Sequence, residues 1–450
     1  MSNFLEIDTT ALFQQVPSEQ EWIPEGHLAR FVLEVVLQMD LTAFVYRGSG
    51  SKAYPPATVM AMLIYGYLTG VFSSRKIETA TYDSIAFRFI AGNTHPDHSR
   101  LSAFRKRFQG EFKKLFLRVL VIASEMGIAR LGSVAVDGTK MKANASKHSA
   151  LSWAHAEKIE VQLKQEIEML LAQADQADNV PRPDGFDLPA EIALRTDRLA
   201  GIAKAKAKIE ERAAERHARE LAAYAEKLAE RELKATQTGK KSGGKPPKEP
   251  VPGPLPGDQV NLTDEESRIM PTSGGAFDQC YNAQAAVDTE TMLVMAAYVT
   301  QATNDKKEVE PMLKELAAAP ECLGQVDTFL ADTGYCSAAN VAVCHIAGIE
   351  PLIAVQRERH HPDCMERFTE PPALPKDATP VQKMAHRLKT IAGRKLYALR
   401  KQIVEPVFGI IKSVMGFRRF SMRGLESANN EWNLVCLAWN VKRLAKLRPQ

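Results

Sequence analysis

The sequence predicts an α/β core, a mixed β-sheet with flanking helices, together with an all-α N-terminal domain and a helical insertion after the first core strand. Three observations predict this arrangement. Apolar residues recur at helical spacing up to about residue 125, short Val- and Ala-rich runs typical of buried strands follow, and a long Ala-, Glu-, Lys- and Arg-rich segment separates the first such run from the others. A chain of 450 residues, 45% of them apolar, is sufficient for two or three domains.

The first 125 residues show the periodicity of several short helices. Helices are expected over 31–37, 59–67, 74–82 and 84–91. Another is expected to begin at His98, and it carries the basic residues Arg100, Arg105, Lys106 and Arg107. A basic helix among short ones favours a helix-turn-helix-like DNA-binding domain over residues 1–125, with Arg105 and Arg107 on the DNA. The alternative is a helical cap whose basic face is only solvated.

Strand signals begin at residue 131, where a Val-rich run ends in Asp137-Gly138 and predicts a buried strand leading into a turn. Later segments predict a hairpin over 279–300, a helix over 306–318 and a strand over 326–331. A helix over 337–347, a strand over 350–355 and a mostly helical C-terminus over 380–447 are expected to follow. With the intervening segment set aside, this order matches an RNase H-like mixed sheet, in which an antiparallel hairpin lies beside parallel crossovers. The predicted catalytic core therefore comprises residues 126–145 and 276–450.

The segment between the first two strands is charged and helical. Residues 146–235 contain a partial seven-residue apolar repeat, for example at Leu199, Ile202 and Ile209, which predicts one or two long exposed helices with a turn around 181–189. Residues 236–275 are rich in Pro, Gly and Lys and predict a flexible linker.

Composition restricts the class of protein. The net charge is only +4, so overall charge does not by itself identify a nucleic-acid binder. Six scattered cysteines without a CxxC pair argue against a disulfide framework. No secretory signal and no uncharged apolar stretch of membrane-spanning length is visible, so we expect a cytoplasmic, nucleoid-associated protein.

Three acids stand where such a fold places its functional groups. Asp137 and Asp332 each follow a predicted strand, and Glu405 lies in the late helical region. Phosphodiester cleavage is favoured by two divalent cations about 3.5–4 Å apart, and carboxylate oxygens suit Mg²⁺ or Mn²⁺. Each acid also has an ordinary interpretation, because Asp-Gly and Asp-Thr-Gly commonly end strands and a lone helical Glu is usually solvated.

The combination of short motifs resembles the DDE transposases of bacterial insertion sequences. The resemblance covers most of the chain outside the charged insertion. It rests first on two strand ends, Asp-Gly-Thr-Lys at 137–140 with Ala-Asn-Ala-Ser at 143–146, and Ala-Asp-Thr-Gly-Tyr at 331–335. It rests further on a Tyr-to-Lys helix at 397–412, followed by Gly-Phe-Arg-Arg-Phe at 416–420 and Arg-Gly at 423–424. Two N-terminal segments also match, Pro-Pro-Ala-Thr at 55–58 and Pro-Asp-His-Ser at 96–99.

The resemblance implies metal-dependent cleavage at the ends of an insertion sequence and strand transfer into target DNA. It implies that Asp137, Asp332 and Glu405 are catalytic and hold two Mg²⁺ or Mn²⁺ ions, with Asp137 between both. The implied partners are double-stranded DNA, as terminal inverted repeats and target, and a second copy in a homodimer on that DNA. Two alternatives remain: a catalytically silent DNA-binding derivative, and a metal-dependent nuclease without strand transfer.

The group's Tyr–Arg–Glu–Lys signature is matched with one departure. Tyr397, Glu405 and Lys412 fill three positions, but Arg400 is one residue further from Glu405 than expected, whereas Lys401 has the expected separation of four. On a continuous helix Lys401 would share a face with Glu405 and Lys412, and Arg400 would point well away. Pro406 suggests that Glu405 lies at a helix start.

Basic and aromatic residues around this helix complete the predicted DNA contacts. The expected DNA-binding set is Tyr397, Arg400, Lys401, Lys412, Arg418 and Arg419, in addition to Arg105 and Arg107. Phe417 and Phe420 are expected to pack into the core. His360, His361 and Cys364 are expected to belong to a solvated loop, and Cys336 is expected to be an ordinary core thiol.

Overall fold

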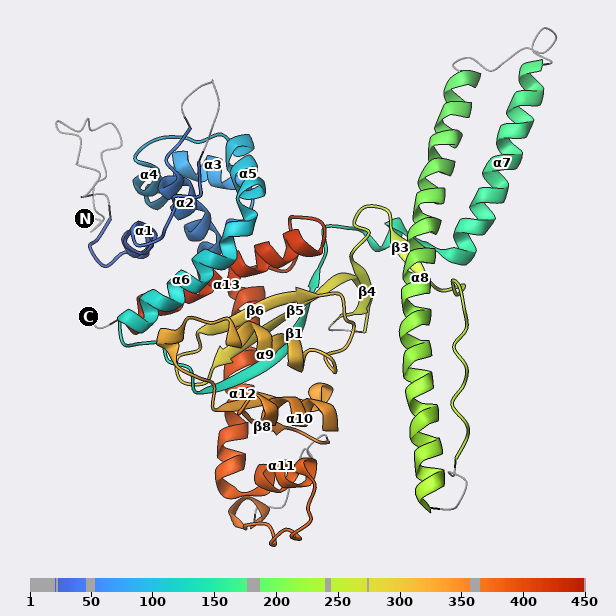
Figure 1. The fold of residues 1–450 in the computed structure, drawn as a ribbon. Helices are drawn as coiled ribbons and strands as arrows, with labels where there is room; N and C mark the ends of the chain where they lie inside the picture. Colours follow the sequence, from blue (N-terminus) through green and yellow to red (C-terminus); the bar gives the residue numbers. More distant parts are fainter. Residues whose placement is uncertain are drawn as a thin grey trace, which may run out of the picture. The chain divides into compact units, whose positions relative to one another are not determined.

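The computed structural model describes residues 21, 23–45, 53–175, 187–238, 244–272, 275–356 and 365–448. The chain divides into two compact units, each of which is described by itself (Figure 1). The core unit comprises Met1–Met141 and Tyr281–Gln450, and the arm unit comprises Lys142–Cys280.

The N-terminal part of the core unit is helical, as the periodicity predicts. Its α-helices are α1 (Leu28–Leu37), α2 (Pro56–Thr69), α3 (Ser74–Asp83), α4 (Ile85–Ala91), α5 (His98–Arg107) and α6 (Phe112–Glu125). Helix α2 starts with a proline in its first turn and ends at Gly70, whose φ of 87° is the left-handed conformation common at helix ends. Residues 59–68 of α2 are all buried, which makes this helix the centre of the N-terminal layer.

The core unit contains the predicted mixed sheet. Its strands are β1 (Ser133–Lys142, with the last residue in the arm unit), β5 (Phe277–Asp288, core from residue 281), β6 (Val294–Thr300), β7 (Thr328–Ala331) and β8 (Glu350–Ile353). The order is β6-β5-β1-β7-β8. Strands β5 and β6 form the expected antiparallel hairpin, while β1, β7 and β8 are parallel neighbours. Strand β7 is buried throughout, as expected for a parallel strand covered on both faces.

The first strand is longer than predicted. The expected turn at Asp137-Gly138 is wrong, because β1 continues to Lys142. It pairs with β7 only from Ser133 to Ala135, but its other neighbour β5 provides a second, antiparallel ladder. The Thr289 N–H donates to the Ser133 carbonyl at 3.1 Å near one end of this ladder. A paired backbone therefore carries Asp137 inside a strand.

Helices cover the sheet. They are α9 (Val309–Ala317), α10 (Ala338–Ile346), α11 (Pro380–Lys389), α12 (Ile391–Gly409) and α13 (Leu425–Leu447). Helix α13 packs against β6 and also against α2 and α6 of the N-terminal layer (Figure 1). The Asn440 side chain donates to and accepts from the Val294 backbone, at 2.8 Å in both bonds, and so satisfies part of the free edge of β6.

The packing of α13 changes the predicted domain division. A sequence boundary near residue 125 suggests a separate N-terminal domain, whereas the structure joins these helices and the sheet in one compact unit. The physical reason is that α13 is buried on all sides from Asn430 to Val441. One face packs on β6, and the faces that do not contact the sheet are covered by α2 and α6.

The arm unit consists mainly of two paired helices, α7 (Trp153–Asp175) and α8 (Leu188–Thr238). Leu163 on α7 joins Ile202 and Ile209 on α8 in one apolar cluster, so the seven-residue repeat correctly predicted the inner face. Arg195 donates to Glu166 at 2.8 Å across the pair. Most of the turn predicted between the helices, residues 181–186, lies outside the described residues.

Three short parts of the segment predicted as a flexible linker, residues 236–275, form regular secondary structure. Helix α8 runs to Thr238, β3 (Gln259–Asn261) pairs with β2 (Ala150–Ser152), and β4 (Arg268–Pro271) pairs with the first residues of β5. Val260 and Met270 are buried and give these short strands apolar contacts.

No single helix in the described ranges combines the length and apolar composition required to cross a bilayer. Only the strongly bent pair α2 and α3 meets that test, when the two are taken together.

Candidate active site

The Asp137 carboxylate is mostly buried within the sheet, with 18% of its side chain exposed. Burial raises the pKa of this carboxyl to about 6, and the neighbouring acids Asp332 and Asp305 add to the increase. The Arg400 guanidinium and the Gly138 N–H, which donates to Asp137 Oδ1 at 2.8 Å, act in the opposite direction. The positive charge near Asp137 is therefore too small to offset the effect of burial on its pKa.

This burial has a measurable consequence for pH dependence. The carboxyl of an unfolded Asp has a pKa near 3.9, so the folded state binds the additional proton between about pH 4 and 6. The contribution of Asp137 to the free energy of unfolding should thus decrease as pH rises through this window, by about 3 kcal/mol in total. Between pH 4.5 and 7, urea unfolding in EDTA should show a loss that is about 2 kcal/mol larger in the parent chain than in Asp137→Asn. Equal pH profiles for both proteins would contradict it.

Asp332 lies where the sequence predicts, directly after β7. Its side chain caps the short helix Thr333–Tyr335 by accepting from the Gly334 N–H at 2.8 Å. The side chain remains 40% exposed. Asp332 can therefore cap the turn after β7 through Oδ1 and still have a carboxylate exposed enough to bind a ligand.

Glu405 is carried by α12, and its side chain is 55% exposed. The prediction that it starts a helix is wrong, because α12 begins at Ile391 with Thr390 as its cap, and Pro406 lies inside it. The helix then continues as a π-helix over Ile410–Val414. An interior proline removes one backbone donor, and a π segment often occurs where a helix serves a functional site.

The three acids converge on a single cation, Arg400. Its guanidinium lies 3.1 Å from Asp137 Oδ2, 3.7 Å from Asp332 Oδ2 and 3.3 Å from Glu405 Oε1, and only 7% of its side chain is exposed. The prediction that Arg400 points away from Glu405 is wrong. The helix does separate the two residues in angle, but an arginine side chain is long enough to reach back, and the buried charge of Asp137 attracts it.

Two other signature residues connect α12 and the π-helix to the sheet. Lys412 Nζ donates to Thr139 Oγ1 and, at 3.1 Å, to the Lys140 carbonyl, both on β1. Tyr397 is buried, and its hydroxyl donates to the Ala331 carbonyl at 3.3 Å, next to Asp332. The prediction of a DNA contact for Tyr397 is therefore wrong, because both its ring and its hydroxyl are used inside the protein.

The predicted basic residues fall into two groups. Arg105 is buried and donates to the Tyr67 hydroxyl at 3.1 Å and the Phe72 carbonyl at 3.2 Å, so its predicted DNA contact is wrong. The Arg105 guanidinium is therefore engaged inside the N-terminal layer. The remaining basic residues of the predicted set, apart from Arg400 and Lys412, lie on the surface: Arg107, Lys401, Arg418 and Arg419.

The aromatic and thiol predictions are confirmed. Phe417 and Phe420 are each 1% exposed and pack at a centroid distance of 5.6 Å. Cys336 is partly buried, and burial raises the pKa of its thiol, which is the opposite of an activated nucleophile. His360, His361 and Cys364 lie outside the described residues.

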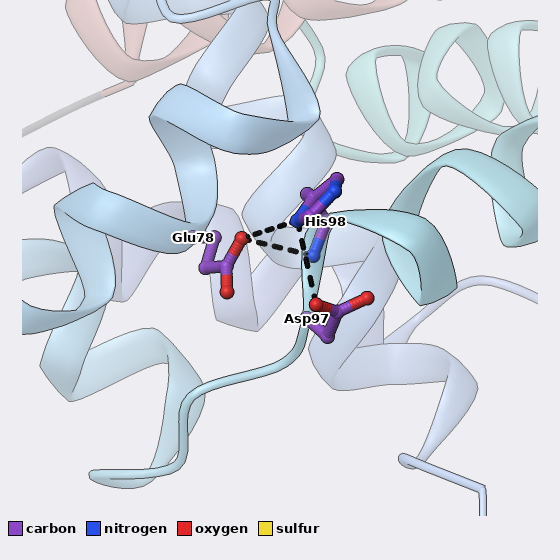
Figure 2. A group of neighbouring side chains, drawn as sticks. All are labelled: Glu78, Asp97 and His98. Atoms are coloured by element: carbon purple, nitrogen blue, oxygen red, sulfur yellow. Dashed lines mark hydrogen bonds and ion pairs between the residues drawn. The ribbon is translucent and has the colours of Figure 1, made fainter.

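A different group has the geometry of a small metal site. The ligand atoms of Glu78, Asp97 and His98 lie within 4.8 Å of one another (Figure 2). However, Asp97 caps α5 through Ser99, and Glu78 accepts from both the backbone N–H and Nδ1 of His98, at 3.1 and 2.7 Å. These bonds account for the group as a helix start, so it supports no metal assignment.

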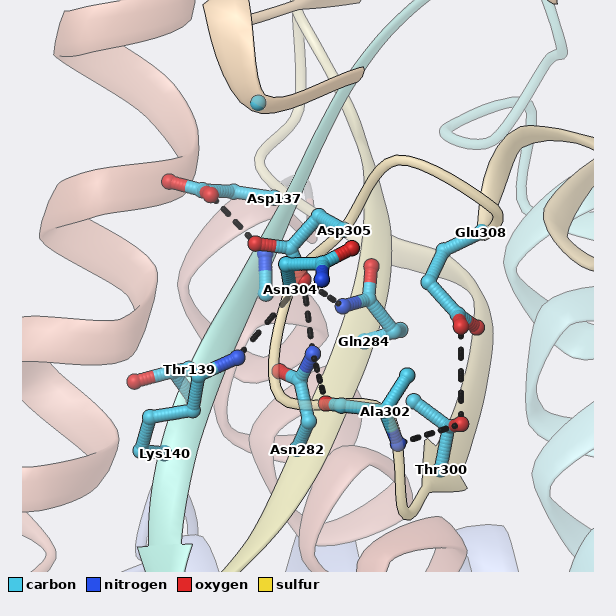
Figure 3. A network of polar contacts seen from close by, with 12 residues as sticks. Asp137, Thr139, Lys140, Asn282, Gln284, Thr300, Ala302, Asn304, Asp305 and Glu308 are labelled. Carbon is cyan, nitrogen blue, oxygen red and sulfur yellow. Dashed lines mark hydrogen bonds and ion pairs between the residues drawn. The ribbon is translucent and has the colours of Figure 1, made fainter. Parts of the chain in front are cut away.

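The sequence prediction missed one acid near the centre. Asp305, in the loop between β6 and α9, accepts from the side chains of Asn282 and Gln284 beside β1 (Figure 3). A signal was present, because Asn282 and Gln284 recur at a spacing of two within an otherwise apolar strand, and such spacing places both on one face.

The chemistry of the three converging acids suits a divalent cation. Each provides hard carboxylate oxygen, and together they already surround one positive group. The raised pKa of Asp137 shows that further positive charge would be favourable at this position.

Comparison with known families gives two matches. Residues 250–441 match the family model described as a transposase DDE domain, and residues 17–107 match the one described as a transposase domain (DUF772). Asp332 and Glu405 lie within the first match, whereas Asp137 and the paired helices lie between the two. No curated protein and no solved structure matches the chain.

Proposed function

Because the chain belongs to the DDE transposases of insertion elements, which use divalent metal ions to cut and join DNA, we propose that Asp137, Asp332 and Glu405 are its metal-binding catalytic acids. The observation that carries this assignment is the convergence of all three carboxylates on the Arg400 guanidinium, although they come from β1, the end of β7 and α12. Acids so far apart in sequence meet in this way because the sheet and the C-terminal helix bring them together.

The sheet supports an RNase H-like core as part of this proposal. Strands β1, β7 and β8 are parallel, with the β5–β6 hairpin on the other side of β1. Asp137 thus lies within β1, and Asp332 directly follows the adjacent parallel strand β7. Helix α12 brings Glu405 to the same place.

Each side chain has a definite part in the proposed reaction. When bound, two Mg²⁺ or Mn²⁺ ions supply activation of the attacking hydroxyl and stabilisation of the leaving oxygen. Asp137, Asp332 and Glu405 would together hold these ions through their carboxylate oxygens. Arg400 balances the charge of the acids and can donate in-plane to a phosphate oxygen. Lys412 holds the π-helix on β1 and so keeps Glu405 opposite Asp137.

The DNA contacts are proposed for the exposed basic residues. Lys401 lies on α12, Arg418 and Arg419 follow the π-helix, and Arg107 ends α5. Lysine and arginine at such positions neutralise phosphates without reading sequence. The proposed substrates are the terminal inverted repeats and target DNA, engaged by a homodimer in the bacterial cytoplasm.

The test is a cleavage and joining assay with DNA carrying the element's own ends. Mg²⁺ or Mn²⁺ should support cleavage followed by joining of the 3′ end to a target plasmid, and EDTA should abolish both. Cleavage without joining under every metal condition would instead indicate a nuclease. DNA binding without cleavage would indicate a silent derivative. Full activity in Asp137→Asn, Asp332→Asn and Glu405→Gln together would reject the three acids.

A further inference from the structure

A polar network lies against β1, on the strand face opposite to the one that bears Asp137 (Figure 3). At its centre, Asp305 Oδ1 accepts from Asn282 Nδ2 at 2.6 Å and from Gln284 Nε2 at 2.7 Å, with Lys140 Nζ at 3.8 Å. The two amides belong to β5 and are 0% exposed. Buried amides are costly unless they are hydrogen-bonded, so this carboxylate is what makes them tolerable in an otherwise apolar strand.

The network packs directly on the backbone next to Asp137. A Cβ placed on Gly138 would lie 2.6 Å from Asp305 Oδ1 and 2.7 Å from Asn282 Oδ1, and closer still to Gln284 Nε2. A Cβ at this position would therefore have to displace the ends of these three side chains. The Gly138 N–H donates to Asp137 Oδ1, so the peptide that the network contacts also orients the carboxylate.

The same network reaches the turn that holds Asp332. Gln284 Oε1 accepts from the Tyr335 hydroxyl at 2.5 Å, and Tyr335 ends the short helix that Asp332 caps. Asn340 Nδ2 then donates to the carbonyls of Tyr335, at 2.6 Å, and Lys306, at 2.8 Å. The loop bearing Asp305 is therefore bonded to the segments that carry both aspartates.

We propose that Asp305 is a positioning residue for metal binding: by accepting from Asn282 and Gln284, it holds Asp137 and Asp332 at the separation that divalent cations require. This inference rests on the proposed function, because it assumes that those aspartates bind metal. Groups that orient metal ligands commonly change affinity by about ten- to a hundredfold when removed. We place Asp305 outside the set of metal ligands, because its Oδ1 already accepts from two amide donors.

The experiment measures Mn²⁺ binding without DNA, as the rise in the melting temperature of the full chain with MnCl₂. Asp305→Ala should require about ten- to a hundredfold more Mn²⁺ for half of the maximal rise. Asp305→Asn keeps an oxygen that can accept from both amides and should recover most of the affinity. Equal Mn²⁺ midpoints for Asp305→Ala and the parent chain, or an Asn variant as weak as the Ala variant, would overturn the inference.

Two further variants separate positioning from loss of folding. Glu308→Gln removes a charge from the same loop, but Glu308 accepts from the Tyr298 hydroxyl at 2.9 Å and not from the amides, so its Mn²⁺ midpoint should be unchanged. If Asp305→Ala is unfolded in EDTA, Gln284→Met tests the same connection from its other end and should show the same shift. A parent-like midpoint in Gln284→Met would then overturn the inference.

Asp332→Asn distinguishes failure of this inference from failure of the proposed function. If Asp332→Asn loses Mn²⁺ stabilisation and Asp305→Ala keeps it, only the role of Asp305 is wrong. If Asp332→Asn also retains the full rise in melting temperature, the metal site itself is wrong.

Discussion

Asp137→Asn is expected to reduce metal-dependent DNA cleavage by about a thousandfold or more, while the metal-free protein stays at least as stable as the parent chain. Its carboxylate is the least exposed of the three acids around Arg400, so the substitution removes a buried ligand of the proposed metal site. A metal ion supplies several kcal/mol of transition-state stabilisation, which is the origin of the expected rate loss. The amide keeps the shape of the side chain and removes a buried charge.

The two outcomes are measured on the same preparations. Single-turnover cleavage of end-containing DNA reports the rate, and urea unfolding in EDTA at pH 7 reports stability. Asp327→Asn is the matched control, since Asp327 precedes the same strand that Asp332 follows and is exposed. It should cleave at the parental rate. Cleavage by Asp137→Asn within tenfold of the parent would contradict the prediction, and so would a large loss of stability, which would explain inactivity without any role in metal binding.

Glu431→Ala is expected to destabilise the core unit by about 3–5 kcal/mol, a large part of the usual stability of a domain. Glu431 on α13 is 0% exposed. It accepts from the Tyr67 hydroxyl at 2.8 Å, from Ser421 N and Oγ at 2.8 and 2.5 Å, and from Met422 N at 3.1 Å. Arg105 in turn donates to Tyr67. Removing the acceptor leaves the buried Tyr67 hydroxyl without its partner and the buried Arg105 guanidinium without a nearby negative charge.

Denaturant unfolding, or the yield of folded protein if the variant does not accumulate, measures this effect. Glu426→Ala on the first turn of the same helix is the control, because Glu426 is exposed and should change stability by no more than about 0.5 kcal/mol. A Glu431→Ala protein as stable as this control would show that the network contributes little to joining the N-terminal helices to α13.

Most of the secondary structure follows from local patterns. The hairpin of β5 and β6, the buried strand before Asp332 and the helices from α1 to α5 all lie close to their predicted ranges, because apolar periodicity and turn residues act over a few positions. Identifying Asp332 as a strand end succeeded for the same reason. The strands in 259–271 were missed because they are only three and four residues long and depend on distant partners in β2 and β5.

Arg105 and Arg400 show why the site was harder to predict than the fold. In sequence, each is one basic residue among several on a helix, and nothing nearby distinguishes a surface side chain from one drawn inward. The partners that decide are far along the chain: Tyr67 for Arg105, and Asp137 for Arg400. Helical geometry predicted the backbone direction of Arg400 but not where a long, flexible side chain meets buried negative charge.

Residue chemistry and local spacing, together with the resemblance of the combined motifs to DDE transposases, were therefore enough to propose the three acids and the elements that carry them. Only the tertiary structure decided that Asp137 lies inside a longer strand, that Arg400 joins all three carboxylates, and that Asp305 supports two of them from the opposite face of the strand. These are consequences of long-range pairing and burial, since charge–charge and hydrogen-bond energies depend on distance in space and on exclusion of water, and neither quantity is encoded in the spacing of residues along the chain.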